Sequence, residues 1–417
     1  LSIRRQRQMC IRDSPKHRPG KRAPAWPHEG INCAVRILAD ENIPYVREAF
    51  SVLGEVRMVP GRTITPELVR QADVLLVRSI TKVDEALLEG SSIRFVATAT
   101  IGEEHVDTAY LAERGIGFAS APGSNANSVA EYVIAALLAL QEHFQFDWRG
   151  MKLGVVGIGN IGTRVVKKAT ASGMTCILND PPLARQTGDP KYRPIEEVFD
   201  CDTVTLHVPL TYAGPDATYH LANETFFRRL RPGAIFINTA RGPVADTQAL
   251  KRALNDGWLK ACVLDVWENE PDIDVELLKR TFIGTPHIAG YSFDGKVNGT
   301  KQVYEATCRF FGLESKWDPT PLLPKPDCPQ VVVDGMVSDS VDALREVIRP
   351  VYDIWGDDAA MRDMLRLSPQ ERATLFDRLR RDYPQRREFF NTRVIVKPRN
   401  ADLERQLAGI GFRLEGR

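Results

Sequence analysis

The sequence lacks three features that would quickly assign it to a class of protein: a surplus of charge, a long apolar run and a pattern of paired cysteines. Its 417 residues carry a formal net charge of +1, which gives no reason to expect nucleic acid as a partner. The most apolar window, residues 129–140, contains Glu131 and is shorter than the roughly 18 residues that a membrane span requires. We therefore predict a globular protein with neither a nucleic-acid nor a membrane partner.

The seven cysteines are odd in number, widely scattered and free of any Cys-x-x-Cys pair. This spacing predicts neither a disulfide framework nor a zinc site. It is typical of small buried thiols in a reducing cytosol. We therefore expect no metal and a cytoplasmic location.

Residues 1–34 differ in texture from the rest of the chain. The first 30 contain eight Lys and Arg against Asp13 and Glu29, a net charge of about +6, and no apolar run that could serve as a signal peptide. Their four prolines between 15 and 27 would interrupt the amphipathic helix of a transit peptide. The segment "VRILADENIPY" from Val35 reads as a first strand. We therefore treat residues 1–34 as a non-native or disordered extension outside the fold.

Beyond this extension, short β-prone runs alternate with helical patterns, which is typical of βαβ units and a mostly parallel sheet. A first block ends near residue 123, and a second contains six predicted strands. Between them, residues 124–144 predict one long helix that Ser124 or Asn125 can cap. Prolines in residues 318–329 mark a linker before a small α+β domain. The expected class is therefore α/β, with two doubly wound parallel-sheet domains and a small third domain.

A glycine-rich turn in the second block predicts a dinucleotide site. Gly157, Gly159 and Gly162 form a Gly-x-Gly-x-x-Gly pattern between an apolar strand and a helical pattern that begins near Asn160 and Ile161. The first glycine permits a tight turn, the second lets the backbone approach a pyrophosphate, and the third allows close packing of helix and strand. The pyrophosphate would then meet the positive end of the helix. The alternative is a glycine turn in an ordinary βαβ unit.

Asp180 indicates which dinucleotide binds. It ends the next predicted strand, 23 residues after Gly157, where it can accept hydrogen bonds from both ribose hydroxyls of adenosine. Its carboxylate would repel a 2′-phosphate. The sequence therefore predicts NAD rather than NADP as the cofactor.

Polar side chains follow three further predicted strands of this block. The segments "FINTARG", "VLDVWENEP" and "GTPHIAGY" supply Arg241, then Asp265 with Glu268 and Glu270, then His287. The carboxyl ends of parallel strands meet at one edge of a sheet, so we expect these residues to converge. The set suits oxidation of a 2-hydroxy acid. Arg241 offers two parallel donors to a carboxylate, and His287 can take the hydroxyl proton.

The partner that orients His287 is open between two glutamates. Glu270 would hydrogen-bond the other ring nitrogen and fix the tautomer, but Glu268 competes, and spacing alone does not separate them. Asp265 ends a strand close to the expected nicotinamide and is a candidate contact to the cofactor. A lone histidine is more often structural, and the neighbouring NAD site and Arg241 favour the catalytic role.

Two other clusters of cationic residues are less specific. Arg78, Ser79 and Lys82 follow a strand of the first block and offer a plausible place for a phosphate. A surface ion pair is the alternative for Arg78, and we expect Lys82 to be solvated. The run "RLRRDYPQRREFF", residues 378–390, is expected to form a solvated or interface face rather than a nucleic-acid patch.

Four motifs, in this order and spacing, resemble those of the NAD-dependent D-isomer-specific 2-hydroxyacid dehydrogenases: "GVVGIGNIG", "NTARG", "LDVWENEP" and "TPHIAG". The resemblance covers residues 35–417 and extends to one branch of the family, which has an additional C-terminal domain. It implies three catalytic residues, Arg241, Glu270 and His287. It implies NAD contacts at Asp180, Val208, Asp265 and Gly290, and substrate contacts at Ser79, Thr100 and Tyr291. Val208 stands where relatives can have threonine, so only a backbone contact is expected there.

The resemblance also implies roles for the domains and a reaction. It implies a flavodoxin-like substrate-binding domain from residues 35–123 and 288–320, a Rossmann NAD-binding domain from 124–287, and a dimerisation domain from 321–417. The expected reaction is NAD-dependent oxidation of a small phosphorylated 2-hydroxy acid, 4-phospho-D-erythronate, by a homodimer in pyridoxine biosynthesis.

Two alternatives remain open. D-3-phosphoglycerate dehydrogenase or another D-2-hydroxyacid dehydrogenase would use the same chemistry on a different acid. A non-enzymatic NAD sensor would use the same fold without the reaction. The presence of Arg241, Glu270 and His287 together disfavours the sensor, because a sensor needs no proton acceptor beside the nicotinamide.

Overall fold

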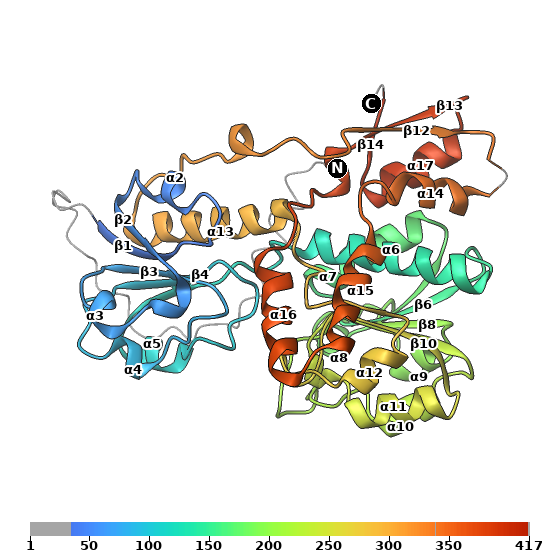
Figure 1. Cartoon of the computed structure of the whole chain (residues 1–417), viewed down its shortest axis with the longest axis horizontal. Helices are drawn as coiled ribbons and strands as arrows, with labels where there is room; N and C mark the ends of the chain where they lie inside the picture. The colour runs from blue at the N-terminus through green and yellow to red at the C-terminus, as the bar shows by residue number, and fades with distance from the viewer. Residues whose placement is uncertain (1–34, 338, 416–417) are drawn as a thin grey trace.

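The computed structural model describes residues 35–337 and 339–415. The expectation for residues 1–34 lies outside this part of the chain. Two α/β lobes lie side by side, and a smaller unit formed by C-terminal residues sits against the second lobe (Figure 1). Every sheet in the described part of the chain is parallel, and the expected α/β class is confirmed.

The first lobe is a five-stranded sheet in the order β2-β1-β3-β4-β5. Its strands are β1 (Val35–Asp40), β2 (Gly54–Val59), β3 (Val74–Val77), β4 (Phe95–Thr98) and β5 (Gly117–Ala119). This is the flavodoxin-like order. Its helices are α2 (Val46–Phe50), α3 (Pro66–Val69), α4 (Glu85–Leu88) and α5 (Thr108–Glu113). A later helix, α13 (Phe293–Phe311), also packs into this core through Val303, Tyr304 and Cys308.

Strand β2 was not predicted from the sequence. This strand pairs only with β1 and forms one edge of the sheet. Its side chains alternate between partly buried and exposed, with Glu55 and Arg57 on the exposed side. The strand therefore has no continuous apolar run like those of the buried strands beside it.

The second lobe is a six-stranded sheet in the order β11-β10-β9-β8-β6-β7. Its strands are β6 (Lys152–Val156), β7 (Thr175–Asn179), β8 (Thr203–Leu206), β9 (Ala234–Asn238), β10 (Leu259–Leu264) and β11 (Ile283–Gly284). Its helices are α7 (Asn160–Ala171), α8 (Pro181–Thr187), α9 (Ile195–Phe199), α10 (Glu224–Arg229), α11 (Thr247–Asn255) and α12 (Val275–Arg280). Strand β6 lies between β7 and β8, so the winding reverses at its carboxyl end. Ligands bind open α/β sheets at such a point.

Helix α6 (Ala126–Phe144) joins the lobes and is buried along most of its length. The expectation that Ser124 or Asn125 caps it through a side chain is wrong. Asn125 occupies the capping position with φ −105° and ψ 10°, outside the extended region from which a side-chain oxygen reaches the free N–H groups. Its side chain lies against Gly290 instead.

The third unit has a three-stranded sheet of β12 (Gln330–Asp334), β13 (Arg393–Lys397) and β14 (Arg413–Leu414). Helices α14 (Ser340–Ile348) and α17 (Ala401–Ile410) place apolar side chains in the same core as α6 and the second sheet. The third unit is therefore packed onto the second lobe through a shared core. Short 3₁₀ turns occur at Gly61–Thr63, Gly242–Val244, Thr320–Leu322, Asp363–Arg366 and Phe389–Asn391.

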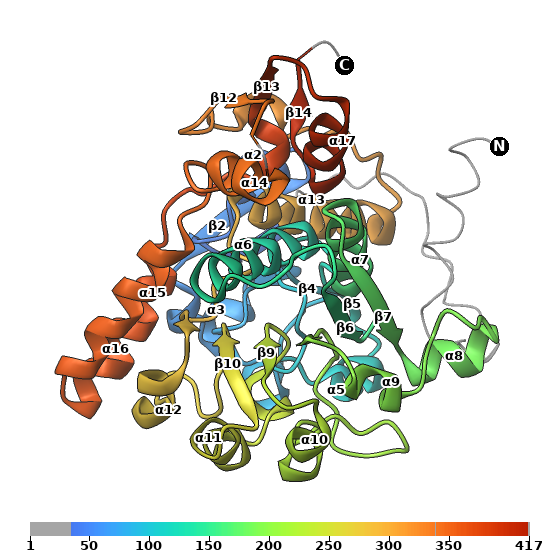
Figure 2. The same ribbon diagram turned by 90° about the vertical axis from the view of Figure 1, so that its right-hand side faces the viewer.

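Two helices of the third unit leave its small sheet. Figure 2 shows α15 (Ile354–Arg362) and α16 (Pro369–Arg381) extending along the flank of the second sheet. In Figure 1, α16 lies between the two lobes. Asp358 of α15 accepts a hydrogen bond from the backbone N–H of Gly284 at 2.8 Å, which ties this helix pair to strand β11.

The arginine run of residues 378–390, expected to form a solvated or interface face, is buried in part against other elements of the chain. Arg386 and Arg387 are buried. Arg387 forms a two-pronged ion pair with Asp294 of α13, with distances of 3.0 and 2.9 Å. Buried charges require such partners, and sequence position alone does not reveal them.

The length and apolar character of the helices show whether any of them could cross a membrane. Among residues 35–337 and 339–415, no helix combines the length and the apolar character needed to cross a membrane.

The buried helix α6 gives a test of the fold. We expect Leu137→Ala to lower the free energy of unfolding by about 2–5 kcal/mol, because it leaves a cavity in a core that α6 shares with α7, α14 and α17. Val52→Ala, at a side chain that is 71% exposed, should change it by less than about 0.5 kcal/mol. Chemical denaturation measures both, and equal effects would contradict the central position of α6.

Candidate active site

The glycine turn joins β6 to α7 at the point where the winding reverses. Gly157 has φ +89°, and a methyl group there would lie 2.8 Å from the carbonyl carbon of His207. A methyl group at Gly162 would overlap the carbonyl oxygen of Gly157, so the close approach of helix and strand requires glycine. A methyl group at Gly159 would meet no described atom within 4 Å. Packing therefore explains two of the glycines, and the third faces open space that suits a pyrophosphate.

The other predicted cofactor residues surround this turn. Asp180 follows β7 and accepts hydrogen bonds from Ile158 N at 2.8 Å and Leu183 N at 3.0 Å, which hold its carboxylate at the turn. Val208 lies beside Gly157. Asn160 and Ile161 open helix α7, whose first N–H groups carry the positive end of the helix dipole. These residues therefore fit a dinucleotide.

The glycines give a paired test. Gly159→Ala should leave the melting temperature unchanged but weaken NAD binding at least tenfold, because the added methyl group takes space reserved for the ligand. Gly162→Ala should lower the melting temperature, because its methyl group overlaps protein atoms. Calorimetry and NAD titration separate the two effects. Full NAD affinity in Gly159→Ala would contradict this placement of the pyrophosphate.

His287 and Glu270 form a hydrogen-bonded pair. The Nδ1 atom of His287 lies 2.7 Å from Oε2 of Glu270, and Oε1 of Glu270 accepts a hydrogen bond from Trp267 N at 2.8 Å. Burial opposes ionisation of Glu270, but the charge and hydrogen bond of His287 lower its pKa. In the described part of the chain, Nε2 of His287 has no hydrogen-bond partner. The imidazole is therefore oriented from one side and free on the other.

The structure separates the two glutamates that spacing left open. Glu268 accepts hydrogen bonds from His220 Nε2 at 2.8 Å and from Thr247 N at 2.9 Å. Glu268 is therefore engaged with the start of helix α11, whereas Glu270 is the partner of His287.

Asp265 holds the turn that carries His287. Its Oδ1 accepts hydrogen bonds from the Thr285 hydroxyl and Ile288 N at 2.6 and 2.8 Å, and its Oδ2 accepts one from Ala289 N at 3.0 Å. His287 sits at φ 58°, a left-handed conformation that persists only where its surroundings impose it. Both oxygens of Asp265 are thus engaged by the turn, and its contact with the cofactor stays a prediction.

Arg241 follows β9 and reaches across to the first lobe. Its Nε donates to Oε1 of Glu104 at 2.9 Å, and its Nη1 donates to Ala240 O at 2.8 Å. Glu104, which lies in the loop after β4, was not predicted from the sequence. A carboxylate therefore occupies one of the donors that were expected to bind a substrate carboxylate.

The predicted substrate residues line one cavity of about 460 Å³ between the lobes. Arg78, Ser79 and Thr100 come from the carboxyl ends of β3 and β4, and Gly290 and Tyr291 come from the turn beyond His287. Thr100 also bonds Gly102 O at 3.1 Å, and a methyl group on Gly102 would lie 2.7 Å from Arg241 Nη2. The structure thus brings Arg241 to the same loop as Thr100.

Arg78 and Lys82 have different environments. Arg78 pairs with the buried Asp40 at 2.9 Å and lines the cavity. Lys82 pairs with Asp84 at 2.8 Å and is 80% exposed. Among the described residues, no group of three or more His, Cys, Asp or Glu side chains could hold a metal ion.

The matches to known families and solved structures define the class. Residues 131–289 match the family described as "D-isomer specific 2-hydroxyacid dehydrogenase, NAD binding domain", and residues 322–411 match a domain of unknown function, DUF3410. NAD⁺-bound 3-phosphoglycerate dehydrogenase from Entamoeba histolytica is 25% identical with a TM-score of 0.58, over 69% of this chain and 99% of that chain. The TT0316 protein from Thermus thermophilus is 27% identical with a TM-score of 0.59, over 67% and 98%. The glycine turn and these matches define an NAD-dependent 2-hydroxyacid dehydrogenase.

Curated relatives narrow the class. The erythronate-4-phosphate dehydrogenase of Salmonella typhimurium (strain LT2) is 46% identical over 368 residues, 88% of this chain and 96% of that protein. The protein of the same name from Enterobacter sp. (strain 638) is 45% identical over 379 residues, 91% and 98%. The chain therefore belongs to the D-isomer-specific 2-hydroxyacid dehydrogenase family, in its erythronate-4-phosphate dehydrogenase branch. The expected family, enzyme class and NAD cofactor are confirmed.

Proposed function

We propose that the protein oxidises 4-phospho-D-erythronate at C2 to (R)-3-hydroxy-2-oxo-4-phosphooxybutanoate, a step of pyridoxine biosynthesis. The observation that carries this proposal is the 2.7 Å contact between His287 and Glu270, on a turn that leads directly into the cavity between the lobes. The names of the relatives from Salmonella and Enterobacter support the choice of substrate.

His287 acts as the base in this proposal. The glycine turn and Asp180 would hold NAD, which would supply the acceptor for the hydride from C2. Nε2 of His287 takes the proton of the C2 hydroxyl, because Nδ1 keeps its hydrogen through the bond to Glu270. Ionised Glu270 then stabilises the imidazolium that forms. The backbone N–H of Trp267 holds Glu270 in place for this role.

Arg241 holds the substrate carboxylate in this proposal. Its Nε already donates a hydrogen bond to the carboxylate of Glu104 at 2.9 Å, so this guanidinium can bind a carboxylate. The substrate carboxylate replaces Glu104 there, which exchanges one ion pair for another. Glu104 belongs to the first lobe, so this exchange also couples substrate binding to the contact between the lobes.

A cytoplasmic homodimer completes the proposal. The five described cysteines are all free, which suits a reducing compartment. Strand β12 lies at an edge of the small sheet, and the exposed side chains of Val332 and Met336 lie on it and just beyond it. An apolar sheet edge of this kind is a suitable surface for a second copy of the chain.

The substrate proposal has a direct test. Wild-type protein with NAD should form NADH from 4-phospho-D-erythronate with a higher kcat/KM than from D-3-phosphoglycerate. His287→Ala should lose about 10²–10⁴-fold in kcat and retain NAD binding, because only the proton acceptor is removed. Preference for phosphoglycerate would instead support the activity named for the Entamoeba structure.

The two glutamates offer a matched comparison. Glu270→Gln should lower kcat by about 100-fold or more, because the neutral amide no longer stabilises an imidazolium. Glu268→Gln should keep kcat close to wild type, because this side chain contacts His220 and Thr247 instead. Steady-state kinetics with saturating NAD measures both. A similar loss in each variant would contradict the assignment of Glu270.

A further inference from the structure

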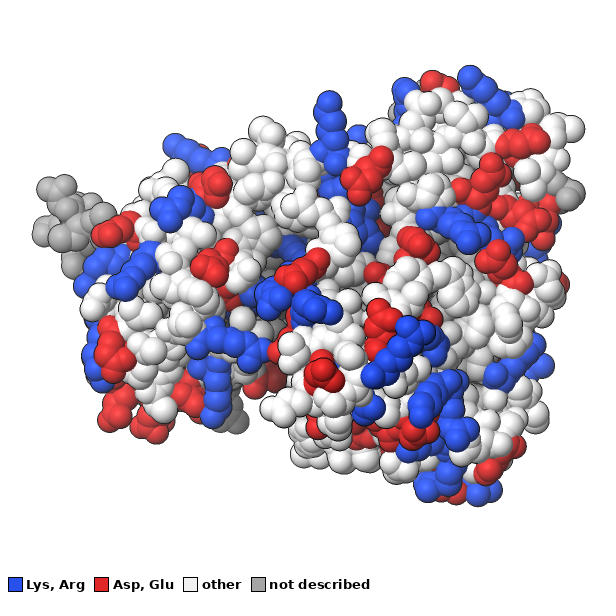
Figure 3. All heavy atoms as spheres, in the orientation of Figure 1, with Lys and Arg blue, Asp and Glu red and all other residues white. Residues whose placement is uncertain are grey.

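The cavity between the lobes carries more positive charge than its neighbours neutralise. Its basic lining residues are Arg62, Arg78, Lys296, Arg380 and Arg381. Its acidic lining residues are Glu41 and Asp377. Figure 3 shows Lys and Arg side chains interspersed with acidic ones along the junction of the two lobes. The surplus suits an anionic ligand.

Three of the five cations already have acidic partners. Arg78 pairs with Asp40, Arg62 with Asp377, and Arg381 with Asp382, at 2.9, 2.9 and 2.8 Å. Lys296 and Arg380 have no acidic side chain within 4 Å in the part of the chain that the structure describes. These two cations are therefore available to a ligand.

Lys296 lies in the first turn of α13, whose N-terminal end faces the cavity through Gly295. Its Nζ stands 4.6 Å from the centre of the Tyr291 ring, a cation–π distance. Burial lowers the pKa of Lys296 to about 8, and the positive charges of Arg78 and Arg386 add to this effect. An anion at this place would relieve the repulsion and would also meet the positive end of the helix dipole.

Arg380 comes from α16 of the third unit and contacts the same tyrosine. Its Nε donates to the Tyr291 hydroxyl at 3.2 Å, and no other hydrogen bond of its guanidinium is found within the described residues. Its charge also contributes, after the larger effects of burial and His287, to the pKa of Glu270. Arg380 therefore lines the cavity beside Tyr291.

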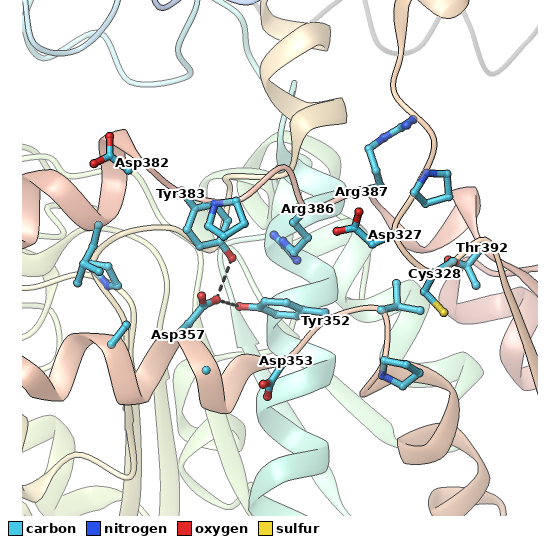
Figure 4. Close-up of a pocket in the computed structure, with 18 of the residues that line it drawn as sticks. Asp327, Cys328, Tyr352, Asp353, Asp357, Asp382, Tyr383, Arg386, Arg387 and Thr392 are labelled. Atoms are coloured by element: carbon cyan, nitrogen blue, oxygen red, sulfur yellow. Dashed lines mark hydrogen bonds between the residues drawn. The ribbon is translucent and has the colours of Figure 1, made fainter.

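Contacts of Asp377, and of Tyr383 just beyond the helix, place the C-terminal half of α16. Asp377 pairs with Arg62 of the first lobe at 2.9 Å. On the other side, Tyr383 packs edge-on against Tyr291 and donates to Asp357 of α15 at 2.8 Å. Figure 4 shows this bond and the second one that Asp357 receives, from Tyr352 at 3.0 Å, at the wall of a cavity of about 600 Å³ behind α16. The third unit thus positions the backbone of Arg380, and the Tyr291 hydroxyl accepts a hydrogen bond from its guanidinium.

We propose that Lys296 and Arg380 form the subsite for the phosphate group of the substrate, so that the third unit supplies a substrate-binding side chain. This inference rests on the proposed function, which provides the phosphorylated acid. Lysine offers a point charge and arginine a planar fork of donors, and a phosphate has three oxygens to accept both. Residues 322–411, which match a domain of unknown function, thereby gain a role in specificity.

Kinetics of Lys296→Met and Arg380→Met test the subsite. Each variant should raise KM for 4-phospho-D-erythronate about 10- to 100-fold, because one charged hydrogen-bonding partner is lost. The kcat/KM for unphosphorylated D-erythronate and the affinity for NAD should change less than threefold. Arg380→Lys should recover part of the loss. Arg378→Met, an exposed arginine of the same helix that does not line this cavity, is the matched control and should behave as wild type.

Binding of inorganic phosphate, followed by calorimetry, gives a readout that does not depend on turnover. The subsite is supported if phosphate binds wild type and Arg378→Met but does not bind the two subsite variants. If wild type then fails to oxidise 4-phospho-D-erythronate, only the proposed function is contradicted. The subsite alone is overturned if wild type oxidises 4-phospho-D-erythronate and both variants keep the wild-type preference for the phosphorylated acid. Equal losses on both acids also overturn it, because they indicate a general structural role.

Discussion

Asp265 accepts three hydrogen bonds from the turn after β11, and this buried carboxylate determines where the neighbouring side chains lie. Burial raises the pKa of Asp265, so its ionised form depends on those bonds for compensation. The turn holds His287 at a positive φ, and in this conformation its Nδ1 contacts Glu270. Tyr291, four residues later, then reaches Arg380 and the cavity. The pairing of base and acid and the wall of the substrate cavity thus depend on one carboxylate.

The cavity is formed by three parts of the chain. The first lobe contributes the carboxyl ends of β3 and β4, the second contributes the turn after β11, and the third contributes α16. Two ion pairs connect these parts, Arg241 with Glu104 and Arg62 with Asp377. Because both pairs are partly exposed, each contributes little to stability. Arg62 and Asp377 also line the cavity and place charge there.

The sequence predicted that Arg241, Asp265 and His287 converge, because they follow the carboxyl ends of strands. Parallel strands bring their carboxyl ends to one edge, so Arg241, Asp265 and His287 could be identified from the segments that follow apolar runs. The choice between Glu268 and Glu270 could not be made in that way, because the two are only two residues apart and the loop geometry alone decides which reaches His287. Strand β2 was missed because an edge strand needs no continuous apolar run.

The sequence by itself determined the α/β class and the glycine turn between β6 and α7, because each depends on local spacing along the chain. Only the tertiary structure decided which residues from distant segments contact each other. Glu104 meets Arg241 across 137 residues, and Arg380 meets Tyr291 across 89. An arginine-rich run such as residues 378–390 looks solvated when only its composition is known. Burial and charge pairing depend on which other elements fold against it, and no local pattern encodes that arrangement.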